Sequence, residues 1–106
     1  MTKKLRAILT ELRHRFKLLY GERLIQIILF GSQAWGDAEP GSDIDVLVVL
    51  KDPVNPGDEI DRTIDIVAEL SLQHDEVISC VFIGEQRFTH RHGPLLRNIR
   101  REGITI

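Results

Sequence analysis

Three stretches of the chain show the spacing of amphipathic helices. Apolar residues recur every three or four positions over residues 3–20, which predicts a helix with a basic polar face. A second helix is predicted over residues 58–73, with Asp58 as its N-cap and a core-facing side made of Ile60, Ile64, Val67, Ala68 and Ser71. A third is predicted over residues 94–102, because proline suits a first helical position, and residues 85–88 are expected to form a short turn.

Three shorter runs are almost continuously apolar and rich in β-branched residues, as strands covered on both faces would be. They span residues 24–30, 43–50 and 77–83. Residues 31–42, between the first two runs, hold three glycines, one proline and two serines, which predicts a tight turn with one helical turn at 32–35. After the last helix, Ile104 and Ile106 predict a tail that packs on the domain.

The predicted order is helix, strand, strand, helix, strand, helix, which indicates a small α/β domain with helices on a three-stranded sheet. A chain of 106 residues fits one domain, residues 1–106. The connection of about twelve residues between the first two strands allows either hairpin or crossover geometry, so their relative direction stays open.

Composition favours a globular protein away from membranes. Hydrophobic residues make up 42% and charged residues 28%, and no apolar run approaches the roughly 20 residues of a membrane helix. No signal-peptide pattern is seen at the N-terminus, so a cytoplasmic location is the expectation. The single cysteine, Cys80, lies in an apolar run and is interpreted as a small buried side chain.

Charge is unevenly distributed along the chain. Residues 1–23 hold seven Lys or Arg and two Asp or Glu, residues 24–84 hold two and twelve, and residues 85–106 hold five and two. Acidic residues in the middle suit a divalent cation, and basic ends suit phosphate or an acidic partner. Ordinary solvated helix faces are the alternative interpretation for most of these side chains.

Asp43 and Asp45 form the strongest candidate for chemistry. Two residues apart on a strand, they present their carboxylates on one face, where they repel unless a cation lies between them. Magnesium suits such oxygen ligands, although two solvent-facing acids at a strand start would look the same. Gly31 and Ser32 shift the balance, because a glycine after a buried strand and the first amides of a helical turn form a phosphate site.

The pattern Gly31-Ser32, ten residues, Asp43-Ile44-Asp45 resembles the signature of the polymerase-beta-like nucleotidyltransferase superfamily. Gly36 and the pair Ser42-Asp43 resemble its minimal nucleotidyltransferase (MNT) branch, small proteins encoded beside a helical HEPN-domain partner in toxin–antitoxin pairs. The resemblance is close over residues 29–50. It implies an α/β (α+β) fold with a three- to four-stranded mixed sheet flanked by helices.

The resemblance also implies an activity. The Gly31-Ser32 turn would grip the triphosphate of ATP, and Asp43 and Asp45 would be catalytic residues that bind Mg²⁺. A hydroxyl of a partner protein would attack the α-phosphorus, so that AMP is transferred and pyrophosphate released. The chain would then act as an antitoxin towards a HEPN toxin, and a partner chain or self-association would complete so small a site.

One element of the family pattern is missing. Relatives supply a third carboxylate from the following strand, whereas residues 77–83 contain no Asp or Glu and only Ser79 as a polar oxygen donor. Glu76, just before this strand, is the remaining candidate for a third catalytic acid. The gap leaves an alternative function, a catalytically degenerate antitoxin or interaction module, and a nucleic-acid-binding role for the basic ends is the least favoured reading.

Overall fold

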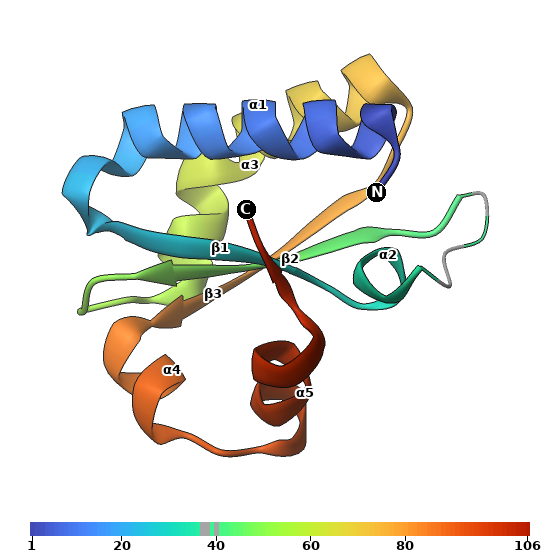
Figure 1. Cartoon of the computed structure of the whole chain (residues 1–106). Helices are drawn as coiled ribbons and strands as arrows, with labels where there is room; N and C mark the ends of the chain where they lie inside the picture. The colour runs from blue at the N-terminus through green and yellow to red at the C-terminus, as the bar shows by residue number, and fades with distance from the viewer. Residues whose placement is uncertain (37–38, 40) are drawn as a thin grey trace.

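The computed structural model describes residues 1–36, 39 and 41–106. Figure 1 shows them as one sheet between two layers of helices. The elements are α1 (Lys3–Tyr20), the 3-10 turn η1 (Gly21–Arg23), β1 (Leu24–Phe30), α2 (Ser32–Trp35), β2 (Ile44–Leu50), α3 (Pro56–His74), β3 (Ile78–Gly84), α4 (Glu85–His90), α5 (Pro94–Glu102) and β4 (Ile104–Thr105). The first and last predicted helices, the helical turn and the three predicted strands are confirmed to within a residue.

The sheet has four strands within the described residues, in the order β3-β2-β1-β4. β1 runs antiparallel to both β2 and β4, and β2 runs parallel to β3. The first two strands therefore form a hairpin-like pair, and the β2-to-β3 connection crosses over through α3. This confirms the expected mixed sheet, and the tail expected to pack forms its fourth strand.

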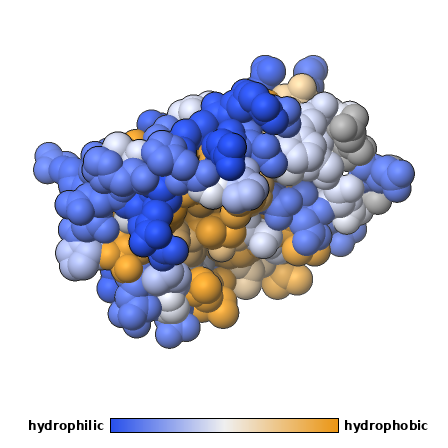
Figure 2. Space-filling model, turned by 90° about the horizontal axis from the view of Figure 1, so that it is seen from below, coloured by the Kyte–Doolittle hydropathy of each residue, from blue (hydrophilic) through white to orange (hydrophobic). Residues whose placement is uncertain are grey.

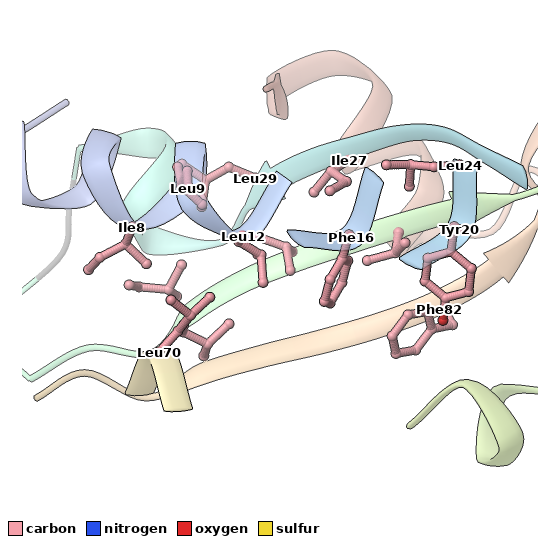
Figure 3. Packing of buried hydrophobic residues seen from close by; sticks show 14 of the residues in the cluster. Ile8, Leu9, Leu12, Phe16, Tyr20, Leu24, Ile27, Leu29, Leu70 and Phe82 are labelled. Carbon is pink, nitrogen blue, oxygen red and sulfur yellow. The ribbon is translucent and has the colours of Figure 1, made fainter. Parts of the chain in front are cut away.

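The main core fills the space between one face of the sheet and helices α1 and α3 (Figure 3). Phe16 of α1 stacks on Phe82 of β3 and meets Tyr20 edge-on, with ring centroids 6.3 and 6.1 Å away. A smaller core on the opposite face joins β1 and β2 to α5 through Ile28, Leu47, Val49 and Ile99. Even-numbered residues of β2 thus face α1 and α3, and odd-numbered residues face α4 and α5.

The predicted start of α3 is wrong, and its predicted apolar face is right only in part, because Val67 packs against the main core whereas Ile60 and Ile64 do not. Asn55, whose side chain accepts a hydrogen bond from the amide of Asp58 at 3.3 Å, is the N-cap. Ile60 and Ile64 are 48% and 55% exposed, while Glu59 is only 3% exposed.

Glu59 can be buried because its carboxylate is fully partnered. It accepts hydrogen bonds from Tyr20 at 2.9 Å, Arg23 at 3.1 Å and Arg62 at 3.0 Å. Such charge-assisted bonds offset the desolvation of the carboxylate. The helix therefore turns Glu59, rather than Ile60 or Ile64, toward the interior at this end, while Ile66, Val67 and Leu70 pack against the main core further along.

The segment after β3 is a helix, α4, where only a short turn was predicted. Its start is capped from outside, because the Asp52 carboxylate accepts a hydrogen bond from the amide of Gln86 at 3.0 Å. Gly84 permits this contact, since a Cβ at that position would collide with the Asp52 carboxylate. Caps supplied by a distant loop leave no local sequence signal.

Candidate active site

The glycine-rich turn is one turn of helix between two glycines with positive φ. Gly31 precedes it with φ 75° and ψ −162°, and Gly36 ends it with φ 79° and ψ 7°. The carbonyl of Gly31 accepts hydrogen bonds from the amides of Ala34 at 3.1 Å and Trp35 at 3.3 Å. Helix geometry leaves the first amides of such a turn, those of Ser32 and Gln33, without an acceptor in the turn itself.

Asp45 lies directly against this turn. A Cβ added to Gly31 would fall 2.7 Å from Oδ2 of Asp45, so only glycine lets the carboxylate approach. The hairpin register explains the contact, because Phe30 is paired with Asp45 and Gly31 follows Phe30. The structure therefore brings the candidate phosphate-binding turn and one candidate metal ligand into contact.

Asp43 is the second acid at this point. Residues two apart along an extended chain share a side, so Asp43 and Asp45 both project from the face that carries α4 and α5. Burial raises the pKa of the Asp45 carboxyl above its usual range, and the negative charge of Asp43 raises it further. Keeping both carboxylates ionised therefore costs free energy, and a cation bound between them would lower this cost.

Two carboxylates side by side fit magnesium. This ion commonly takes one or two protein carboxylates and completes its octahedron with water and phosphate oxygens. No group of three His, Cys, Asp or Glu side chains with metal-binding geometry occurs in residues 1–36, 39 and 41–106. Among the described residues, Asp43 and Asp45 are therefore the carboxylates available to such an ion.

Ser79 occupies the position across from Asp45 on the neighbouring strand. β2 and β3 are paired in parallel with Asp45 opposite Ser79, and Ser79 is exposed. Register neighbours project from the same face of a sheet, so a hydroxyl stands where a third acid would meet the first two. From the sequence, Ser79 is only the polar residue of an apolar strand, because the register between two strands cannot be read from the sequence of either one.

Glu76 is directed elsewhere. Its carboxylate forms an ion pair with Nζ of Lys4 at 3.0 Å. It lines a cleft of about 680 Å³ together with Leu5 and Ile8 of α1, Ile44 of β2, and Gln33 and Gly36 of the glycine-rich turn. Glu76 is thus not brought to Asp43 and Asp45.

Other side chains of the turn and of α5 make local contacts. Gln33 donates from Nε2 to the carbonyl of Ser42 at 3.2 Å, which ties the turn to the start of β2. Trp35 is 47% exposed at the end of the turn. Arg97 and Arg100 hold the loop before α5 by donating to its backbone carbonyls, including the carbonyl of His92 at 3.1 Å from Nε of Arg97.

Two other expectations can be compared with the structure. Cys80 packs partly buried against the main core, and burial raises the pKa of its thiol to about 12.

In the part of the chain that the structure describes, every helix is too short or too polar to span a bilayer. Val77, just before β3, Val81 in β3 and Leu95 in α5 are exposed, and Figure 2 shows apolar surface on the side of α4 and α5.

Proteins with this sequence pattern are known. Residues 5–103 match the profile described as "Nucleotidyltransferase domain". A Methanocaldococcus jannaschii protein named "Putative protein adenylyltransferase MJ0604" is 35% identical over 98 residues, 91% of each chain. A second protein of that organism, of the same description and numbered MJ1305, is 40% identical over 84 residues, which cover 76% of this chain and 56% of that protein.

Solved structures share the fold. A crystal structure of a toxin–antitoxin with AMP-PNP superposes with a TM-score of 0.63 at 20% identity, covering 98% of this chain and 72% of that one. A crystal structure of a mutant MntA–HpeT toxin–antitoxin gives 0.61 at 17% identity, with coverages of 98% and 71%. The expected polymerase-beta-like fold is thereby confirmed, and with the match over residues 5–103 the chain belongs to the nucleotidyltransferase domain family.

Proposed function

We propose that this protein transfers AMP from ATP to a hydroxyl group of a partner protein. The observation that carries the proposal is the contact between Asp45 and Gly31, with Asp43 beside it. It places two carboxylates against the start of a helical turn, so that a magnesium–triphosphate unit could be bound from both sides. The names of the two M. jannaschii relatives support protein adenylylation in particular.

Each group of the site has a role in this reaction. The turn that begins at Gly31 and Ser32 would bind phosphate oxygens through the amides of Ser32 and Gln33, and Asp43 and Asp45 would hold Mg²⁺. Bound Mg²⁺ would supply charge neutralisation for the oxygens that gain charge as the adenylyl group is transferred. The acceptor oxygen forms a bond to the α-phosphorus as its hydroxyl proton is released to solvent, the bond from that phosphorus to the α,β-bridging oxygen breaks, and pyrophosphate leaves with the electron pair of that bond. Positioning of the hydroxyl and the triphosphate supplies much of the rate.

Ser79 supports a second candidate function. With a hydroxyl across from Asp45, the site presents two carboxylates where relatives present three. We leave Glu76 out of the catalytic set because it is paired with Lys4. A protein with this site would bind magnesium and nucleotide, transfer AMP slowly or not at all, and act as an antitoxin by binding its partner.

The proposed partner is a HEPN-domain toxin in the cytoplasm. The chain is similar in fold to proteins crystallised in toxin–antitoxin assemblies, one of them MntA–HpeT. In addition, the domain has no second lobe among its described residues that would cover the exposed site, so the acceptor protein itself would have to provide that cover.

The experiment combines binding and transfer. Calorimetry with ATP and Mg²⁺ should show binding to the wild type that is lost in Asp43→Asn/Asp45→Asn. The matched control, Asp61→Asn/Asp65→Asn, removes two exposed acids from α3 and should bind normally. Equal binding by the wild type and the site variant would refute the metal site.

Transfer is then measured with ATP labelled at the α-phosphate and the protein encoded by the neighbouring gene. Label on the partner supports adenylylation. A tight complex without label supports the non-catalytic antitoxin, provided that calorimetry has shown nucleotide binding.

A further inference from the structure

A groove lies between one side of α1 and the C-terminal strand. It has a volume of about 450 Å³ and is lined by Met1, Arg6, Leu9, Thr10, Arg13, His14, Lys17, Ile104, Thr105 and Ile106. An adjoining hollow of about 180 Å³ shares part of this lining and extends the groove along residues 24–27 of β1. In Figure 1 the C-terminal end lies just below α1.

The cations of the groove form one row. Arg6, Arg13 and Lys17 are seven and four residues apart, which places them on one side of the helix. All three are exposed, and among the residues that the structure describes no carboxylate lies within ion-pair distance of them. The opposite side of α1 differs, because there Lys4 and Arg15 are paired with acids.

The floor of the groove is apolar and includes an open strand edge. Leu9 is buried beneath it, and Ile104 is 38% exposed. β4 pairs with Ile28 and Leu29, and the amide of Ile106 donates to the carbonyl of Ile27 at 2.9 Å. β4 is the outermost strand of the sheet, so its outer edge has no strand partner among the residues that the structure describes. Unpaired strand edges accept an additional strand readily.

We propose that this groove binds an extended, acidic segment of another polypeptide. The row from Arg6 to Lys17 covers eleven helical steps, about 16 Å, which equals roughly five residues of extended chain. Acidic side chains at alternate positions of that segment face the cations, and the apolar side chains between them contact the floor. A polypeptide is favoured over a nucleic acid because the open edge offers backbone hydrogen bonds that a phosphodiester chain cannot complete.

The test measures fluorescence anisotropy with a labelled six-residue peptide that alternates glutamate and valine. The wild type should bind it with an affinity that falls as salt rises, and should bind the lysine–valine counterpart at least tenfold more weakly. Arg6→Glu/Arg13→Glu/Lys17→Glu should lower the affinity about tenfold or more, because three ion pairs are reversed. The neutral variant Arg6→Gln/Arg13→Gln/Lys17→Gln should fall between the two.

The matched control carries the same change of net charge elsewhere. Lys51→Glu/Arg87→Glu/Arg101→Glu alters three exposed cations outside the groove and should bind as the wild type does. Asp43→Asn/Asp45→Asn should also leave peptide binding unchanged, which separates this proposal from the adenylylation proposal. Strand addition to β4 predicts slower amide hydrogen exchange in Ile104–Thr105 when the peptide is bound.

Three results would overturn the proposal. One is the absence of any binding by the glutamate–valine peptide at low salt. Another is an equal loss of affinity in the groove variant and in the charge-matched control. The third is competition by a single-stranded oligouridylate that binds the groove more tightly than the peptide, which would assign the groove to nucleic acid.

Discussion

Replacing Gly31 by alanine tests whether the turn and the acid pair form one site. At φ 75° and ψ −162° the backbone lies in a region that only glycine adopts without strain, which costs about 1–3 kcal/mol for another residue. The added Cβ would also fall 2.7 Å from Oδ2 of Asp45, so the carboxylate must move. We expect a total loss of about 3 kcal/mol in the free energy of unfolding, or roughly 10–20 °C in Tm.

Gly36→Ala is the matched control. Gly36 has a similar φ of 79°, but an added Cβ there would meet nothing within 4 Å. The left-handed conformation alone costs roughly 1–2 kcal/mol for alanine. Both variants therefore carry the penalty of a positive φ, which is larger at Gly31 because its ψ lies outside the left-handed region, and only Gly31→Ala also collides with Asp45.

Thermal unfolding and calorimetry with Mg²⁺ and ATP are measured on both variants at a temperature where both are folded. Gly31→Ala should weaken nucleotide binding at least tenfold, which corresponds to about 1.4 kcal/mol, and Gly36→Ala should change it only slightly. If Gly31→Ala binds magnesium and ATP as tightly as the wild type, then the packing of Asp45 against the turn does not create the site.

Three further substitutions test other parts of the structure. Ser79→Asp should speed AMP transfer at least tenfold, because it adds a carboxylate across from Asp45. Val81→Asp, two residues further along β3, should not change the rate. Equal transfer rates for the two variants would refute the register argument. Asp45→Asn should raise Tm at neutral pH without Mg²⁺. The pKa of Asp45 is raised in the folded state, so the protonated carboxyl stabilises the fold at low pH. This stabilisation is complete below the unfolded-state pKa and is lost as the pH rises through the folded-state pKa. A lower Tm of Asp45→Asn would contradict this reasoning. Glu59→Ala should lower the free energy of unfolding, measured by urea denaturation, by about 3 kcal/mol, because it removes a buried carboxylate that accepts three hydrogen bonds. Glu69→Ala breaks an exposed ion pair and should change this free energy by less than about 1 kcal/mol.

The helices and strands followed from local pattern wherever one side of an element faces a core. In α1, for example, the structure buries Leu5, Ile8, Leu9, Leu12 and Phe16 of the apolar pattern, although Tyr20 is buried at the end of the helix and Leu19, the last residue of the pattern, is exposed. In α3 the same rule failed, because Tyr20, Arg23 and Arg62 give the Glu59 carboxylate enough hydrogen bonds to bury it. Two of these partners lie more than 30 positions away in the sequence, so no local pattern could have placed them.

The residues of the candidate site could likewise be predicted from the sequence in part, and in part only from the tertiary structure. Gly31, Ser32, Asp43 and Asp45 could be named from the sequence because they lie within fifteen residues and their spacing alone puts the two acids on one side of a strand. The contact of Asp45 with Gly31, the position of Ser79 and the pairing of Glu76 with Lys4 were decided by the tertiary structure. These depend on strand register and on the face of the sheet that each helix covers, which are set by packing between distant segments rather than by the period of any one of them.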